Sequence, residues 1–156
     1  MGRNHSMIVM TTYKLKDFLA YPVRYETADD GTVTAYFRDF DGVTQADDAK
    51  SIDRVALDWL ILSGMVLPKR HEIIPKASAP QAGEKTLEIS PTIALKFILR
   101  NAMTVKNLRP SDLGRLLGMS SQAINALLDV YREGTRFDSL YKALKVCGCD
   151  VSITAS

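Results

Sequence analysis

The chain has 156 residues, of which 46% are hydrophobic and 24% charged, and its formal net charge is +2. These values fit a folded protein of one ordinary domain or two small ones and exclude a disordered or fibrous chain. No apolar run approaches the roughly 18 residues of a membrane span, and no secretory signal opens the chain. We therefore expect a cytoplasmic protein with no membrane partner.

The small net charge hides an asymmetry between the two halves of the chain. Residues 13–63 hold six Lys or Arg against ten Asp or Glu, a net charge of −4, whereas residues 91–156 hold nine against five, a net charge of +4. An acidic half and a basic half indicate two partners of opposite charge, a basic one for the front half and an acidic one for the rear half. The two cysteines, Cys147 and Cys149, have no Cys or His at zinc-like spacing, so we expect free thiols, no metal and no cofactor.

The front half begins with a predicted β-hairpin. Apolar and polar residues alternate in YPVRYET (21–27) and in TVTAYFRDF (32–40), which predicts two strands. Asp30-Gly31, between them, accepts the positive φ of a tight hairpin turn. The following DGVTQA (41–46) predicts a short third strand.

A helix is predicted to begin near Asp48, with Asp47 and Asp48 as cap and dipole partner and Gly64 at its end. Its apolar face recurs at steps of three and four residues: Ala49, Ile52, Ala56, Trp59, Leu60 and Ser63. The Pro- and Gly-rich residues 68–83 predict a linker. KTLEIS (85–90) then predicts a last strand that returns to the first sheet.

The rear half is predicted to be helical. Ser90 can cap a helix and Pro91 suits its first position, so a helix is expected over SPTIALKFILRNAMTV, ending at Asn107-Leu108. Pro110 opens a second helix, SDLGRLLG. Further helices are predicted in SSQAINALLDVY and FDSLYKALKVCG, and the alternating tail CDVSITAS predicts a terminal strand.

The stretch LGRLLGMSSQAINALL (113–128) predicts a helix-turn-helix, which needs two buried stripes, a small residue at the helix crossing and a glycine turn. The predicted inner residues are Leu113, Leu116 and Leu117 in the first helix and Ile124, Leu127 and Leu128 in the second. Gly114 is expected at the crossing and Gly118 in the turn. The Met119 side chain is expected to pack into the turn, and Ser120 is expected to cap the second helix.

The outward side of the second helix is polar and suits the recognition of DNA bases. Gln and Asn can each form a bidentate pair with adenine, and nearby cations suit phosphates. The outward residues are Ser121, Gln122, Asn125, Ala126 and Asp129, and the surrounding cations are Lys106, Arg109, Arg115, Arg132 and Arg136. The predicted DNA-binding set is Ser120, Ser121, Gln122, Asn125, Lys106, Arg109 and Arg115. A plain helical hairpin in a helical core is the alternative.

Residues 113–127, followed by FDSLYKALKVCG, resemble the helix-turn-helix of phage-repressor type. The front stretch, a hairpin followed by Phe37, Asp39, Gly42, VTQ and a helix, is similar to the HicB-type antitoxin domain. In this order the two regions resemble antitoxins with a C-terminal DNA-binding domain, over about residues 20–155. Ala46 is a departure, because many members have glycine there.

The resemblance implies an α+β protein. A truncated, non-catalytic ribonuclease-H-like N-terminal domain of sheet and helix (18–76) would bind a toxin. A linker and last strand (77–89) would lead to an all-helical helix-turn-helix domain with a terminal strand (90–156) for DNA binding and dimerisation. The implied function is that of an antitoxin of a type II toxin–antitoxin pair and not of an enzyme. It would mask a small mRNA-cleaving toxin of the HicA type and would repress its own operon by binding double-stranded operator DNA.

The acidic front half agrees with this role, because the working face of a ribonuclease is expected to be basic. The acidic candidates are Asp29, Asp30, Asp39, Asp41, Asp47 and Asp48, and the predicted toxin-binding set is Asp29, Asp39, Asp41 and Asp47. An ordinary solvated acidic surface is the alternative for each of them.

The terminal strand has no obvious partner within a helical domain, so we expect it to pair across a two-fold axis with a second chain. The protein would then be a homodimer or a higher homo-oligomer. A dimer would present two recognition helices about one DNA turn, roughly 34 Å, apart.

Two other classes of function stay open. A stand-alone DNA-binding repressor would use the front domain to sense a ligand or to oligomerise. A nuclease would need carboxylates around two metal ions about 4 Å apart, and Asp39 and Asp41 with Asp47 or Asp53 would be the candidates. We expect no catalysis, because these acids suit a turn and a helix start. The two histidines, His5 and His71, lie outside the predicted elements and offer little for a general base.

Overall fold

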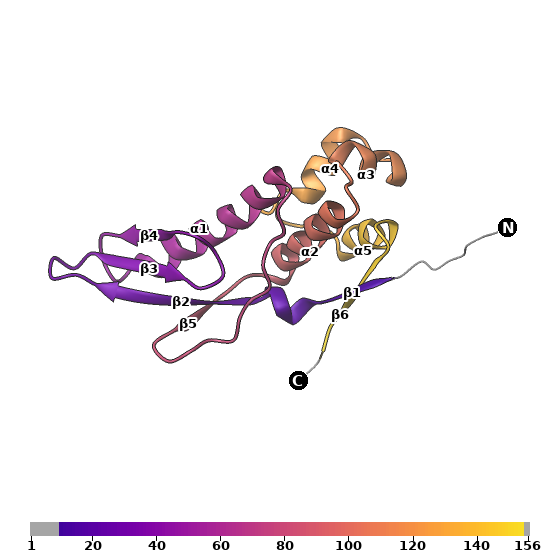
Figure 1. Ribbon diagram of the computed structural model, residues 1–156. Helices are drawn as coiled ribbons and strands as arrows, with labels where there is room; N and C mark the ends of the chain where they lie inside the picture. The colour runs from indigo at the N-terminus through magenta and orange to yellow at the C-terminus, as the bar shows by residue number, and fades with distance from the viewer. Residues whose placement is uncertain (1–9, 155–156) are drawn as a thin grey trace.

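The computed structural model describes residues 10–154 and contains both sheets and helices, so the expected α+β class is confirmed. The molecule is elongated, with a sheet at one end and a group of helices at the other (Figure 1). In chain order the elements are β1 (Thr11–Lys14), the 3₁₀ turn η1 (Leu15–Phe18), β2 (Ala20–Thr27), β3 (Val33–Phe37), β4 (Val43–Ala46), α1 (Ile52–Val66), the 3₁₀ turn η2 (Leu67–Arg70), β5 (Lys85–Glu88), α2 (Pro91–Val105), α3 (Pro110–Leu117), α4 (Ser121–Leu128), α5 (Phe137–Val146) and β6 (Cys149–Ser152). His5 and the expected lack of a leader lie outside the described residues.

No helix within residues 10–154 has the length and apolar character needed to cross a membrane. The four strands of the front half form one antiparallel sheet in the order β4-β3-β2-β5. Gly31, at φ 89°, makes the turn between β2 and β3. The predicted hairpin, third strand and returning strand are therefore confirmed.

Helix α1 covers one face of this sheet and packs on β3, β4 and β5. The Trp59 ring stacks on the Phe37 ring with 4.4 Å between centroids. Gly42 lies directly against the same indole, since a Cβ there would be 2.7 Å from Trp59 Cζ2, and its φ is 130°. Phe37 and Gly42 thus both pack directly against the Trp59 side chain.

The bounds of α1 differ from the prediction at both ends. The helix begins at Ile52, because the Asp48 carboxylate accepts a hydrogen bond from the Ser51 N–H (3.0 Å), and Ala49 lies outside the helix and is exposed. Gly64 does not end the helix, which continues to Val66. A Cβ at Gly64 would lie 2.5 Å from Phe97 Cζ of α2. The glycine therefore serves close packing between α1 and α2.

The connection between α1 and β5 is held at several points. Asn101 of α2 accepts a hydrogen bond from the Ile74 N–H (2.8 Å) and donates one to the Ile74 carbonyl (2.9 Å). The Tyr21 hydroxyl donates to the Pro75 carbonyl (2.7 Å), and Ser78 N–H donates to Asp39 (2.9 Å). Residues 74–78 are thus fixed to both ends of the molecule.

The rear half has the predicted helix starts. Ser90 Oγ accepts a hydrogen bond from the Ile93 N–H (3.2 Å) and caps α2, and Asn107, at φ 55°, ends that helix region. Pro110 opens α3 as predicted. Helices α2 to α5 share one apolar core that includes Phe97, Leu113, Ile124, Leu140 and Leu144.

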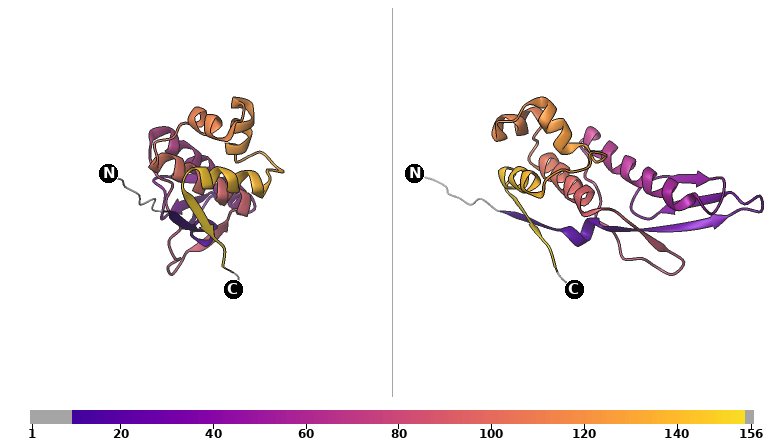
Figure 2. Two further views of the ribbon diagram at one scale, coloured as in Figure 1. Left: turned by 90° about the vertical axis from the view of Figure 1, so that its right-hand side faces the viewer. Right: turned by 180° about the vertical axis from the view of Figure 1, so that it is seen from behind.

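The terminal strand has a partner within its own chain, contrary to the prediction. β6 pairs in parallel with β1, so that Thr11 lies opposite Cys149 and Lys14 opposite Ser152; Figure 2 shows both strands below the helices of the rear half. The expectation that this strand has no partner within its own chain was wrong, because the sequence pattern did not reveal β1; its pairing with a second chain stays a prediction. Ile153 lies beyond the strand and is exposed, and Ala155 lies outside the described residues.

Both cysteines are free and buried within this region, as predicted. Burial is the main cause that raises the pKa of the Cys147 thiol to about 11. A buried thiol with a raised pKa is a packing group and a poor nucleophile.

Candidate functional site

Two short helices, α3 and α4, meet at a sharp glycine turn. Gly118 has φ 65°, and the Met119 N–H donates a hydrogen bond to the Gly114 carbonyl (2.9 Å). A Cβ at Gly114 would lie 3.0 Å from the Met119 carbonyl oxygen and 3.3 Å from Ile124 Cγ1. The two helices can therefore cross this closely because residue 114 has no side chain.

The inner sides of the two helices match the predicted stripes except at one residue. Leu113 and Ile124 are buried, and Leu117 is half-buried. Leu116 was predicted to be inside but is 56% exposed. The buried face of α3 is centred between Leu113, Gly114 and Leu117, and the 100° step of a helix places Leu116 outside it.

The outer face of α4 presents three polar side chains to solvent. Ser121, Gln122 and Asn125 are all exposed. Ser120 Oγ accepts a hydrogen bond from the Ala123 N–H (3.1 Å), so this hydroxyl caps α4 as predicted. A cavity of about 390 Å³ lies between α3 and α4, and Arg115, Ser121 and Asn125 lie on its wall.

Asp112 orients two of the predicted phosphate-binding arginines. Its carboxylate accepts a hydrogen bond from the Arg109 N–H (2.8 Å) and pairs with the guanidinium groups of Arg109 and Arg115. The hydrogen bond from the Arg109 backbone, together with that guanidinium, lowers the pKa of Asp112. The two arginine side chains remain 73% and 69% exposed, so these pairs add little to stability and leave both arginines accessible.

Lys106 lies away from this group. Its ammonium is next to Gly148, where a Cβ would be 3.2 Å from Nζ. The structure thus brings Arg109, Arg115, Ser121 and Asn125 together around α3 and α4, with Gln122 on the same exposed helix. Lys106 is placed beside the start of β6 instead.

A buried lysine supports the end of α4 and was not among the predicted site residues. Lys96, on α2, is fully buried. Its ammonium donates to the Asp129 carbonyl (2.5 Å), to Thr135 Oγ1 (2.8 Å) and to the Ala126 carbonyl (3.5 Å). Burial is the main cause that lowers the pKa of Lys96. The signal in the sequence was a charged residue inside the apolar run IALKFIL.

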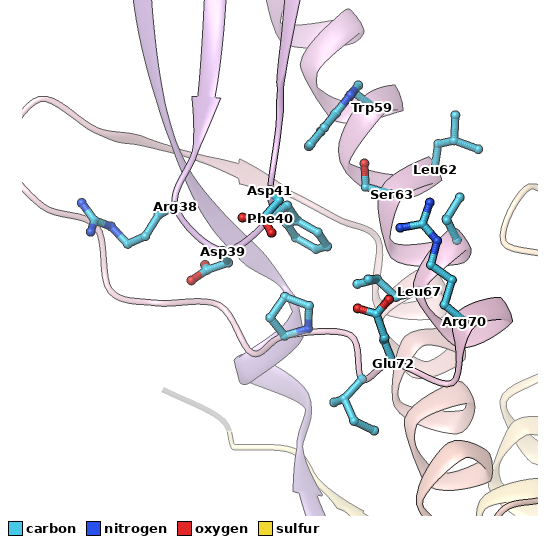
Figure 3. A pocket seen from close by; sticks show the side chains of 13 residues that line it. Arg38, Asp39, Phe40, Asp41, Trp59, Leu62, Ser63, Leu67, Arg70 and Glu72 are labelled. Atoms are coloured by element: carbon cyan, nitrogen blue, oxygen red, sulfur yellow. The ribbon is translucent and has the colours of Figure 1, made fainter.

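The front half carries a second cavity, of about 470 Å³, between the β3–β4 loop, α1 and residues 72–75 (Figure 3). Leu62 and Ile73 lie on its wall and are 55% and 48% exposed. Asp39 and Asp41 lie at the same cavity. The Asp39 carboxylate is bound to Ser78, whereas Asp41 is exposed.

The four predicted toxin-binding acids do not form one group. Asp39 and Asp41 follow the end of β3, whereas Asp29 precedes β3 and Asp47 follows β4. Because Val33 pairs with Ala46 at the opposite end of the antiparallel pair, Asp29 and Asp47 belong to that far end.

The carboxylates considered for a nuclease are also separated. Asp53 accepts a hydrogen bond from the Tyr25 hydroxyl (2.6 Å) and pairs with Lys85 (3.1 Å). Among the side chains of residues 10–154, no group of three or more His, Cys, Asp or Glu gathers where a metal ion could bind.

No family model matches the chain. The chain is 25% identical over 136 residues to the protein named Antitoxin HicB in Escherichia coli (strain K12), a match that covers 86% of this chain and 98% of that protein. It is 26% identical over 137 residues to Antitoxin HicB 2 of Photorhabdus laumondii subsp. laumondii, covering 88% of this chain and 96% of that protein. The chain is thus a distant relative of HicB antitoxins. The match to each relative is nearly end to end and therefore includes both the sheet and the helices.

Proposed function

We propose that this protein is the antitoxin of a type II toxin–antitoxin pair and not an enzyme. Its front half binds and masks a small mRNA-cleaving toxin of the HicA type, and its rear half binds operator DNA and represses its own operon. The observation that carries the proposal is the similarity to proteins named Antitoxin HicB over 86% of the chain. The proposed architecture is a truncated ribonuclease-H-like domain followed by a helix-turn-helix domain of phage-repressor type.

The proposed DNA-binding surface is the exposed face of α3 and α4. A helix that enters the major groove reads bases with polar side chains near its N-terminus. Ser121, Gln122 and Asn125 occupy that part of α4, and Arg109 and Arg115 flank it as exposed cations. The net charge of +4 in residues 91–156 supports binding to a polyanion.

The proposed toxin-binding surface is the cavity of Figure 3. It combines exposed apolar side chains, Leu62 and Ile73, with the exposed carboxylate of Asp41. Residues 13–63 carry a net charge of −4, which complements the basic face expected of a ribonuclease, although Arg38 and Arg70 also lie on the cavity wall. An apolar centre beside a charged rim is the usual arrangement of a specific protein interface.

Toxin binding is tested by co-purification with the product of the small reading frame next to this gene, with a tag on this chain alone. We expect a stoichiometric basic partner that is toxic when expressed by itself. Asp41→Lys should weaken capture by more than about tenfold through like-charge repulsion, whereas Asp29→Lys, at the far end of the sheet, should not. No partner, together with retained binding to the upstream DNA, would favour the stand-alone repressor.

Operator binding is tested by fluorescence anisotropy with a duplex from upstream of the gene and an unrelated duplex. We expect Gln122→Ala and Asn125→Ala each to remove about 1–3 kcal/mol of discrimination between the duplexes. Gln45→Ala, which removes an exposed amide from the front sheet, is the matched control. Unchanged discrimination in both α4 variants would contradict the proposed surface.

A further inference from the structure

A third cavity, of about 300 Å³, lies where the front half meets the rear half. Its wall includes Lys69 and His71 from the turn after α1, Arg100 from α2, and Arg109 at the start of α3. In the side views of Figures 1 and 2 the end of α1 lies beside the helical half. Four basic side chains from three elements thus surround one space.

The basic groups around this cavity are poorly neutralised. Within residues 10–154, Lys69, His71 and Arg100 form no ion pair, and Arg109 shares the single carboxylate of Asp112 with Arg115. Arg100 Nε is buried and meets no hydrogen-bond acceptor among these residues. Burial lowers the pKa of Arg100, and no carboxylate acts in the opposite direction. Two cations without an ion pair among the described residues, Lys69 and Arg100, together with the partly neutralised Arg109, make this space suited to an anion with several acceptor oxygens.

The cavity adjoins the proposed DNA-binding surface. Pro110 lies on its wall and also on the wall of the cavity between α3 and α4. A continuous set of contacts leads from Arg109 through Asp112 to Arg115, which lies beside Asn125. The two cavities therefore meet at Pro110 in the first turn of α3, whose N-terminus carries the positive end of the helix dipole.

We propose that this cavity binds a backbone phosphate of the DNA that α4 reads, so that Lys69 and His71 of the front half join Arg100 and Arg109 in holding the duplex. The inference rests on the proposed operator binding and extends it, because it assigns the toxin-binding half a direct part in DNA binding. A contact to phosphate strengthens binding without regard to base sequence.

The test compares the full-length protein with Lys69→Gln and Arg100→Met in anisotropy titrations at several salt concentrations, using the upstream duplex and an unrelated one. Each variant should bind both duplexes about five- to tenfold more weakly near 0.1 M salt, and the slope of log K against log salt should fall by about 1. Lys76→Gln, an exposed lysine on the same connecting segment but outside the cavity, should bind like the parent.

Two further measurements distinguish the proposal from its alternatives. The melting temperature of Arg100→Met should not fall, because the change removes a buried donor that lacks an acceptor, so its weaker binding would not reflect unfolding. If the parent binds DNA and both variants keep its affinity and slope, the phosphate site is wrong while operator binding stands. If inorganic phosphate raises the melting temperature of the parent but not of Lys69→Gln, and DNA affinity is unchanged, the cavity binds a free anion instead. A parent that binds neither duplex overturns both proposals.

Discussion

Lys96 shows how one buried side chain can define the end of a helix. Its ammonium reaches the Ala126 and Asp129 carbonyls at the C-terminal end of α4 and the hydroxyl of Thr135 in the following loop. A cation at this end also interacts favourably with the helix dipole. Lys96 thus fixes where the proposed recognition helix stops and how the chain continues to α5.

Replacement of this lysine should therefore destabilise the protein. We expect Lys96→Met to lower the free energy of unfolding by about 1–3 kcal/mol, because methionine fills the space but removes the donor to the Ala126 and Asp129 carbonyls and to the Thr135 hydroxyl. Urea denaturation measures the change, with the exposed Lys142→Met on α5 as the control. Equal stability of Lys96→Met and the parent would mean that the cost of burying the ammonium cancels its hydrogen bonds.

At the scale of secondary structure, the contact between α1 and α2 joins the two halves. Phe97 is fully buried, and its ring lies where a side chain at residue 64 would begin. Asn101, one turn further along α2, is hydrogen-bonded to both polar backbone groups of Ile74. The spacing of α1 and α2 thus depends on Gly64, and Asn101 holds the segment that follows α1 against α2.

An added methyl group at this contact should be costly. We expect Gly64→Ala to lower the free energy of unfolding by about 1–3 kcal/mol, since the enclosed Phe97 ring has little room to move. This cost should exceed the gain in helix propensity of roughly 1 kcal/mol that alanine brings. Asp58→Ala, at an exposed position of the same helix, controls for propensity. A Gly64→Ala protein as stable as the parent, with Asp58→Ala as the reference for propensity, would show that the packing cost at Phe97 does not exceed the gain in helix propensity.

At the scale of the whole molecule, the two ends of the chain are joined in one small sheet. β1 and β6 pair in parallel, with Tyr13 opposite Val151, although almost the entire chain lies between them. The acidic front half and the basic rear half therefore belong to one folded unit with contacts at β1–β6, at Gly64 and at Ile74. Under the proposed function, one molecule presents a protein-binding face and a DNA-binding face at a defined spacing.

The role of this small sheet can be tested by removing β1. Deletion of residues 1–14 should leave those β6 amides that are bonded to β1 exchanging with solvent hydrogen nearly as fast as in an unfolded segment, because their acceptors are gone. Deletion of residues 1–9, which leaves β1 whole, should preserve their protection. Hydrogen exchange monitored by NMR or mass spectrometry separates the two cases. Slow exchange at β6 without β1 would point to another partner strand, such as that of a second chain.

Much of the local structure follows from short sequence signals. Ser90-Pro91 predicts the start of α2 because a hydroxyl and a proline suit those two positions in any helix. Asp30-Gly31 and Gly118 predict turns, because glycine tolerates positive φ whatever surrounds it. The polar outer face of α4, with Ser121, Gln122 and Asn125 of the candidate DNA-binding set, follows from helical periodicity.

The sequence by itself thus determined the helices, the hairpin and the polar face of α4, since each depends on neighbours within a few residues. The tertiary structure alone decided that β6 pairs with β1, that Gly64 accommodates Phe97, that Lys96 supports α4 and that Lys69 and Arg109 line one cavity. It also separated Asp29 and Asp47 from Asp39 and Asp41. The physical reason is that strand pairing, close packing and burial of charge are set by residues far apart in the chain, whose approach no local periodicity records.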